Sequence, residues 1–169
     1  MYYALACEVM ENGITIELIS LALVAENGRG VYVQNSSCDF TQADSETCKN
    51  VLSNLGYFDM AQRKPQNDPV PWARYEEIGR IVLAFLKQDT DPTPQFWAYY
   101  GAYDFVAFCQ VFGPHRPNNI PPYFHELRQA LDAEGKYECT PPIELPRHAL
   151  DRARWVKQTV AEMIYPEDL

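Results

Sequence analysis

Hydrophobic residues dominate the first third of the chain in three runs that are separated by turn signals. The runs cover residues 2–10, 14–25 and 31–34 and are rich in β-branched and aromatic side chains. Asn12-Gly13 and Asn27-Gly28 stand between them, and Asn-Gly between two apolar runs is a strong β-hairpin signal. The pattern therefore predicts an N-terminal antiparallel three-stranded meander.

Helical spacing characterises much of the remainder. Between residues 72 and 87, Ile78, Val82 and Phe85 fall on one side of a 3.6-residue period, which predicts an amphipathic helix packed on the sheet. Similar spacing predicts helices over residues 104–112, 123–134 and 148–164, and a partly helical segment over residues 39–56. Strands first and helices interleaved later favour an α/β layered fold.

Residues 96–100 form a short aromatic run bounded by Pro94 and Gly101. This run predicts a buried strand in which Trp97 and Tyr99 share one face and Tyr100 lies on the other. Proline-rich connections are expected over residues 59–71, 114–122 and 141–146. No internal repeat divides the chain, so we expect a single domain over residues 1–169.

Composition restricts the class of partner. The chain has 169 residues, 47% of them hydrophobic, and a formal net charge of -9, so no long-range positive field attracts a phosphate backbone. A protein partner with a basic surface suits this charge better. The acidic residues of the middle segment are expected to be solvated, with a docking patch for a basic partner as the sharper alternative: Asp39, Asp44, Glu46, Asp59 and Asp68.

Five cysteines occur without CxxC spacing, at positions 7, 38, 48, 109 and 139. An odd number without a cleavable signal indicates reduced thiols in the cytoplasm. No apolar run approaches the length of about 18 residues that a membrane helix requires. We therefore expect a cytoplasmic protein without membrane attachment.

Three segments carry a family resemblance: residues 6–13, 97–110 and 147–155. With them the chain resembles the polyadenylate-specific, ribonuclease AS-like branch of the DEDD-type 3′-to-5′ exoribonucleases, over nearly its whole length. The resemblance implies a ribonuclease-H-like fold, with a mixed central β-sheet flanked by α-helices, and it suggests a homodimer.

The family uses carboxylates to hold two divalent cations that activate water and stabilise the leaving oxygen. Its first-strand Asp-x-Glu motif matches Ala6-Cys7-Glu8, and its second aspartate matches Asp104. The resemblance thus implies that Glu8 and Asp104 are remnants of the metal site, vestigial ligands should a metal bind, and that the first aspartate is replaced by Ala6.

The third family motif supplies a histidine base and a last aspartate, which match Arg147 and Arg152. We expect Arg152 to pair with Glu8 or Asp104, because a fixed guanidinium would both replace and repel Mg²⁺. His148 and Asp151 lie one residue from the family positions and are rescue candidates. A slip of one residue, however, rotates a side chain by about 100° around a helix.

Three functional hypotheses follow. The first is a catalytically degenerate exonuclease fold that acts by binding, as an inhibitor, decoy or regulator of a nucleic-acid-processing or defence system, with no cofactor expected; a phage or mobile element would place it in the host cytoplasm. The second is an active exoribonuclease that uses Mg²⁺ or Mn²⁺ in a rearranged site. The third is a non-cutting binder of single-stranded RNA 3′ ends, with Tyr100 and Tyr103 stacking on bases.

Overall fold

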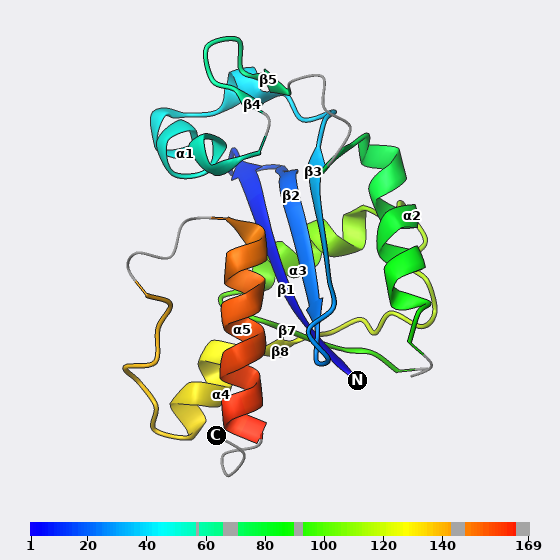
Figure 1. The fold of residues 1–169 in the computed structure, drawn as a ribbon, viewed down its shortest axis with the longest axis vertical. Helices are drawn as coiled ribbons and strands as arrows, with labels where there is room; N and C mark the ends of the chain where they lie inside the picture. The colour runs from blue at the N-terminus through cyan, green and yellow to red at the C-terminus, as the bar shows by residue number, and fades with distance from the viewer. Residues whose placement is uncertain (57, 66–70, 90–92, 143–147, 165–169) are drawn as a thin grey trace.

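A six-stranded mixed β-sheet forms the centre of the protein (Figure 1). The computed structural model describes residues 1–56, 58–65, 71–89, 93–142 and 148–164. The strand order across the sheet is β6-β3-β2-β1-β7-β8. The strands are β1 (Tyr2–Glu11), β2 (Ile16–Ala25), β3 (Gly30–Asn35), β6 (Trp72–Ala73), β7 (Gln95–Ala98) and β8 (His125–Glu126).

The N-terminal meander is confirmed, since β1 pairs antiparallel with β2 and β2 antiparallel with β3. β2 begins at Ile16 rather than at Ile14. The reason is the turn, in which the Asn12 side chain accepts hydrogen bonds from the backbone N–H groups of Ile14 and Thr15. On the other side of β1, β7 and then β8 add in parallel.

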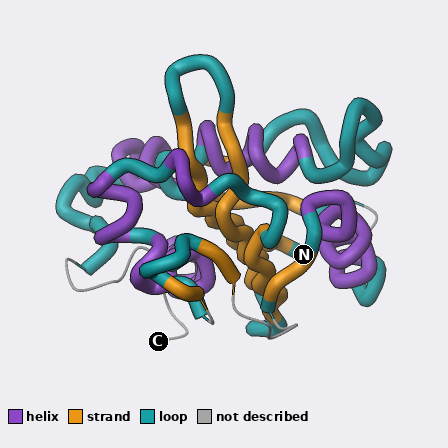
Figure 2. Tube along the Cα trace, turned by 90° about the horizontal axis from the view of Figure 1, so that it is seen from above, coloured by secondary structure: helices purple, strands orange, loops and turns teal. Residues whose placement is uncertain are grey.

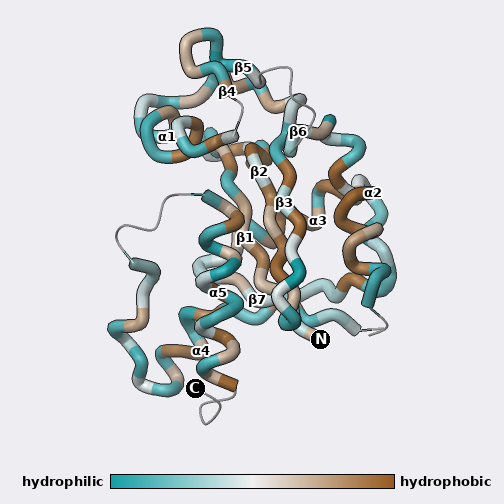
Figure 3. Tube along the Cα trace, in the orientation of Figure 1, coloured by the Kyte–Doolittle hydropathy of each residue, from teal (hydrophilic) through white to brown (hydrophobic). Residues whose placement is uncertain are grey.

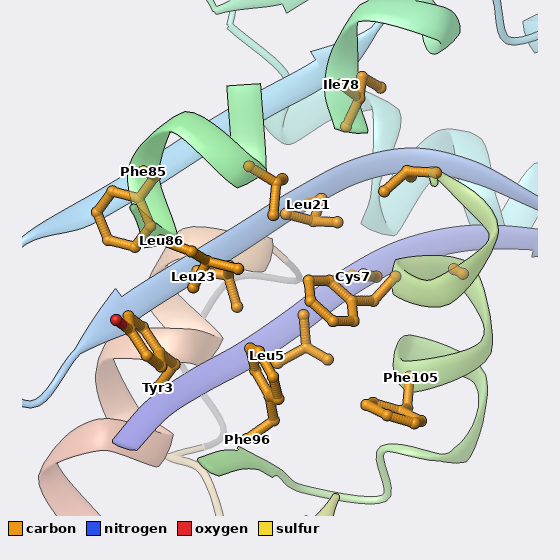
Figure 4. Close-up of a cluster of buried hydrophobic side chains, with 14 of the residues drawn as sticks. Tyr3, Leu5, Cys7, Leu21, Leu23, Ile78, Phe85, Leu86, Phe96 and Phe105 are labelled. Carbon is orange, nitrogen blue, oxygen red and sulfur yellow. The ribbon is translucent and has the colours of Figure 1, made fainter. Parts of the chain in front are cut away.

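Helices cover both faces of the sheet (Figure 1 and, from above, Figure 2). On one face, α2 (Tyr75–Leu86) and α3 (Ala102–Gln110) close a core that includes Leu5, Leu23 and Phe96 (Figure 4). On the other face lie α4 (Leu127–Ala133) and α5 (Ala149–Ile164). Alanines of α5 pack on alanines of β1 and β2, so this long helix lies close to the strands.

A smaller subassembly covers one end of the sheet. It comprises η1 (Phe40–Gln42), α1 (Ser45–Asn50), η2 (Leu52–Asn54) and the two-stranded sheet of β4 (Phe58–Asp59) and β5 (Lys64–Pro65). Phe40, Phe58 and Trp72 pack together inside it, and its outer loops are largely hydrophilic (Figure 3). Asp39 and Asp44 cap η1 and α1, whereas Asp68 lies outside the described residues.

Two predicted helices begin later than the sequence pattern indicated. The segment 72–87 opens with strand β6, because Trp72 and Ala73 pair with β3, and its helix begins at Tyr75. The segment 123–134 opens with β8, because His125 and Glu126 pair with β7, and its helix covers only α4. Such edge pairings depend on the rest of the sheet, so local periodicity does not reveal them.

The aromatic strand is shorter than predicted, ending at Ala98. Trp97 and Tyr99 do share one hydrophobic cluster, as alternation predicted, although both are only partly buried. The chain then turns at Tyr100, whose φ of 49° lies in the left-handed region. The predicted loop 59–71 contains part of the β4–β5 pair, and residues 66–70 and 143–147 lie outside the described residues.

No helix in the described part of the chain is both long enough and apolar enough to span a bilayer. The five cysteines carry free thiols. Cys7 is buried in the α2/α3 core, as its apolar surroundings in the sequence predicted.

Candidate functional site

Strand alternation places Glu8 on the face of β1 that α5 covers. Ala4 and Ala6 pack in the α5 cluster, whereas Leu5 and Cys7 pack in the α2/α3 core. Glu8 follows in the same alternation and is only 5% exposed. The pairing with β2 shifts register directly after Glu8, and such a bulge re-aims the strand that carries it.

Asp104 reaches the same place from the start of α3. Because β7 is parallel to β1, the helix that follows β7 begins beside the end of β1. Gly101 precedes this helix, and a Cβ there would lie 2.2 Å from the Cβ of Ala98, so the tight entry excludes a side chain. Asp104 lies in the first turn of α3 and is 5% exposed.

Arg152 of α5 joins these two carboxylates. Its Nη1 donates to Glu8 Oε1 at 3.0 Å and to the carbonyl oxygen of Cys7 at 3.2 Å, and its Nη2 lies 3.5 Å from Asp104 Oδ2. The guanidinium therefore links the side chain of β1, the backbone of β1 and the side chain of α3. We call Glu8, Asp104 and Arg152 the carboxylate–arginine cluster.

Burial shapes the charge of the carboxylate–arginine cluster. Desolvation raises the pKa of Asp104 to about 7; the guanidinium of Arg152 opposes this shift and the charge of Glu8 adds to it. Desolvation lowers the pKa of Arg152, but Asp104 and Glu8 outweigh it and the net shift is upward. Arg152 thus stays cationic, while Asp104 changes charge near neutral pH.

The carboxylate–arginine cluster does not provide the donors that a pair of divalent cations needs. Hard cations need several oxygen ligands, and both carboxylates here already contact a guanidinium. In the described part of the chain no three His, Cys, Asp or Glu side chains form a group that could hold a metal ion. The residues of the carboxylate–arginine cluster therefore do not fit a pair of divalent cations.

The other family positions are placed as follows. Ala6 is buried in the α5 cluster, with 1% of its surface exposed, and Arg147 lies outside the described residues. The two rescue candidates lie side by side, His148 Nδ1 being 3.6 Å from Asp151 Oδ2 without a hydrogen bond to it. His148 also packs its ring on Tyr32 at 4.6 Å, and neither residue is among the recorded partners of Glu8 or Asp104 in the described residues.

A residue that the sequence did not single out fixes the entry to α3. The carboxylate of Glu126 accepts hydrogen bonds from the backbone N–H groups of Tyr100 at 2.9 Å, Gly101 at 2.8 Å and Arg128 at 3.0 Å. It therefore holds the turn before Asp104 and caps α4 at once. No sequence signal marks this role, because it depends on the pairing of β8 with β7.

The two tyrosines proposed to contact substrate are both accessible. Tyr100 is 69% exposed and Tyr103 is 50% exposed. Tyr100 packs edge-on against Tyr99, which packs edge-on against Trp155 of α5. Tyr103 interacts instead with Glu11 in the β1–β2 hairpin, so the two rings have different neighbours.

Known proteins share this fold and part of the sequence. No protein-family model matches the chain. A structural match with a chain in the structure of the yeast NOT1 MIF4G domain co-crystallized with CAF1 covers 96% of this chain and 78% of that chain, with a TM-score of 0.60 and 10% identity. The corresponding values for exonuclease I from Methylocaldum szegediense are 98% and 41%, with a TM-score of 0.54 and 12% identity. The ribonuclease-H-like fold predicted for the chain is confirmed.

The sequence comparison is more specific. The chain is 35% identical over 137 residues to the 3′-5′ exoribonucleases of two Mycobacterium tuberculosis strains, over 80% of this chain and 76% of each relative. The chain thus belongs to the family of these 3′-5′ exoribonucleases.

Proposed function

We propose that this chain is a catalytically degenerate member of the polyadenylate-specific branch of the DEDD exoribonucleases and that it acts by binding. Its role would be that of an inhibitor, decoy or regulator of a nucleic-acid-processing or defence system. It would need no cofactor and would work through a protein partner, as a homodimer of this chain.

One observation carries the proposal: the guanidinium of Arg152 contacts both family carboxylates. Its distances to Glu8 and Asp104 are 3.0 Å and 3.5 Å. A cation fixed at that distance neutralises the carboxylates that would attract Mg²⁺ and repels the ion itself. At position 6 the family has an aspartate and this chain has an alanine, so a further carboxylate is missing. Ala6 contributes only a methyl group to the packing with α5.

A second candidate is a non-cutting binder of single-stranded RNA. The exposed ring of Tyr100, which Tyr99 and Trp155 support from behind, favours it, because stacking on an aromatic ring requires no metal. The net charge of -9 argues against it, since a phosphate backbone is repelled by an acidic protein.

The test is digestion of a 3′-labelled oligoadenylate with Mg²⁺ or Mn²⁺, run beside calorimetric titration of Mn²⁺ into metal-free protein. The mycobacterial exoribonuclease serves as positive control. The proposal predicts neither shortening of the RNA nor heat of metal binding. Stepwise shortening that is abolished in Glu8→Ala and in Asp104→Ala would establish an active enzyme instead.

The same assay separates the remaining alternatives. An active rearranged site requires His148 and Asp151, so His148→Ala or Asp151→Asn would abolish any digestion. A non-cutting RNA binder would retain the oligoadenylate without shortening it, and its affinity would fall steeply with salt.

A further inference from the structure

The β1–β2 hairpin ends in a rigid turn that stands out from the body of the protein (Figure 2). The Asn12 side chain accepts hydrogen bonds from Ile14 N at 3.0 Å and Thr15 N at 2.9 Å, and Gly13 has a φ of 80°. Ile14 is 91% exposed. The turn thus fixes the backbone that presents a large apolar side chain to water.

A groove of about 310 Å³ lies beside the second arm of this hairpin, which we call the hairpin groove. Ile16, Leu18 and Tyr75 are its apolar lining residues; Thr15, Glu17, Asn35 and Ser37 complete its lining. Asn35 is fixed by a hydrogen bond from its side chain to the carbonyl of Leu18 at 2.8 Å. The hairpin groove is therefore built from held side chains rather than from a loose loop.

Acidic residues predominate on the strand side of the hairpin groove. Glu17 is one of its lining residues, and β2 carries no lysine or arginine, whereas the exposed Arg74 precedes Tyr75 on the helix side. Glu17 Oε1 accepts a hydrogen bond from the backbone N–H of Asp39 at 3.0 Å, which brings a second, exposed carboxylate alongside. No ion pair recorded among the described residues includes Glu17.

A lysine or arginine side chain matches these features. Such side chains lay their aliphatic stems along apolar walls and keep the charged group near water or a carboxylate. A phosphate backbone, in contrast, would be repelled by the carboxylates of Glu17 and Asp39. The shape and the charge thus favour a basic polypeptide over a nucleic acid.

We propose that the hairpin groove binds a basic segment of a protein partner, with a lysine or arginine side chain in the groove beside Glu17 and an apolar residue against Ile14. This inference rests on the proposed function, in that the chain acts by binding, and it names the chemistry of the partner. The hairpin groove lies beside α2, whereas Arg152 approaches the sheet from α5 on the opposite face.

The experiment uses the ¹⁵N-labelled full chain and a synthetic peptide of alternating lysine and leucine residues as the probe. Amide shifts are expected to concentrate at residues 14–18, 35–37 and 75. The dissociation constant should rise about two- to fivefold in Glu17→Gln, as for a solvent-accessible ion pair, and also in Ile14→Ser. Glu138→Gln removes an exposed carboxylate from the segment after α4 and should leave the affinity unchanged.

Several results would overturn the inference. They are shifts centred elsewhere, absence of binding at low salt, or equal weakening by Glu138→Gln and Glu17→Gln. Equal weakening would mean attraction by net charge alone. Binding of oligoadenylate in the hairpin groove would assign it to nucleic acid and also reject the inference.

The two proposals fail separately. Metal-dependent digestion of RNA would reject the proposed function and leave a peptide map in the hairpin groove intact. Absence of RNA digestion together with absence of peptide binding would support the proposed function and reject the inference about the hairpin groove.

Discussion

The guanidinium of Arg152 lies 3.0 Å from the carboxylate of Glu8 and crosses from α5 to β1 to reach it. Glu8 is 5% exposed, so its ionised carboxylate has little water to replace a lost partner. Breaking a buried ion pair by removing one member costs about 3–5 kcal/mol. The pair therefore locks the start of α5 onto the sheet.

Replacement of Arg152 by alanine should accordingly destabilise the protein by about 3 kcal/mol, because Glu8 and Asp104 would both lose their cation. Urea unfolding measures this change. Arg154→Ala is the matched control: this arginine lies on the same helix and its side chain is 63% exposed, so its loss should change the stability by less than about 0.5 kcal/mol. Equal effects of the two substitutions would contradict a special role for Arg152.

Asp104 should make stability depend on pH near neutrality. Its pKa in the folded protein is about 7, above the ordinary value of 3.8. A raised pKa means that the folded state favours the protonated form, so the stabilising contribution is complete below about pH 4 and is lost as pH rises through about 7. The carboxylate of Asp104 thus opposes folding in alkaline solution.

This dependence is measurable as the free energy of unfolding at about pH 5 and about pH 8. The wild-type protein should lose on the order of 2 kcal/mol more than Asp104→Asn over that interval. Asparagine keeps the size of the side chain and removes the titration. An identical pH dependence in both proteins would show that Asp104 does not titrate in this range.

Restoring the family carboxylates should create a cation site. The double substitution Ala6→Asp with Arg152→Asp would place four carboxylates around β1 and α3, the donor set that divalent cations prefer. Calorimetric titration should then detect Mn²⁺ binding, whereas the proposed function expects none for the wild-type protein. The control Ala6→Asn with Arg152→Asn has side chains of the same size without the carboxylates and should show no heat of Mn²⁺ binding. Binding by this control would mean that the ion does not depend on the restored carboxylates.

Much of this arrangement could be predicted from sequence. The meander followed from alternating apolar runs and Asn-Gly turns, and the contact of Arg152 with Glu8 and Asp104 followed from the family positions that these residues match. Side-chain periodicity and motif spacing record these features directly, because each depends on residues that are near in sequence or fixed by a known fold.

Other parts depend on contacts that the sequence does not record. Trp72 and His125 became strand residues because β3 and β7 offered free edges. The role of Glu126 arises from the same edge pairing, and the hairpin groove needs residues 15–18 of β2 beside Tyr75 of α2. Local propensity cannot predict a contact whose partner is supplied by another element.

The turn held by Glu126 offers a final prediction. Its carboxylate accepts three backbone hydrogen bonds, and two of them hold the segment in which Tyr100 adopts a φ of 49°. A left-handed conformation costs a residue other than glycine about 1 kcal/mol or more. Glu126→Ala should therefore destabilise the protein by about 2–3 kcal/mol, since it leaves the part-buried donors of Gly101 and Arg128 unpaired. Hydrogen exchange should accelerate at the amides of Tyr100 and Gly101.

The backbone strain at Tyr100 and the hydrogen bonds that Glu126 accepts should be energetically coupled. Tyr100→Gly removes the steric cost of the left-handed conformation and should stabilise the wild-type protein by about 0.5–1 kcal/mol. In the Glu126→Ala background the freed turn can leave that conformation, so the same substitution should gain less. A double-mutant cycle measured by urea unfolding gives the difference directly. Strict additivity would mean that Glu126 holds the turn without opposing its strain. Glu134→Ala, at an exposed carboxylate that pairs with Lys136, is the control and should show no coupling to Tyr100.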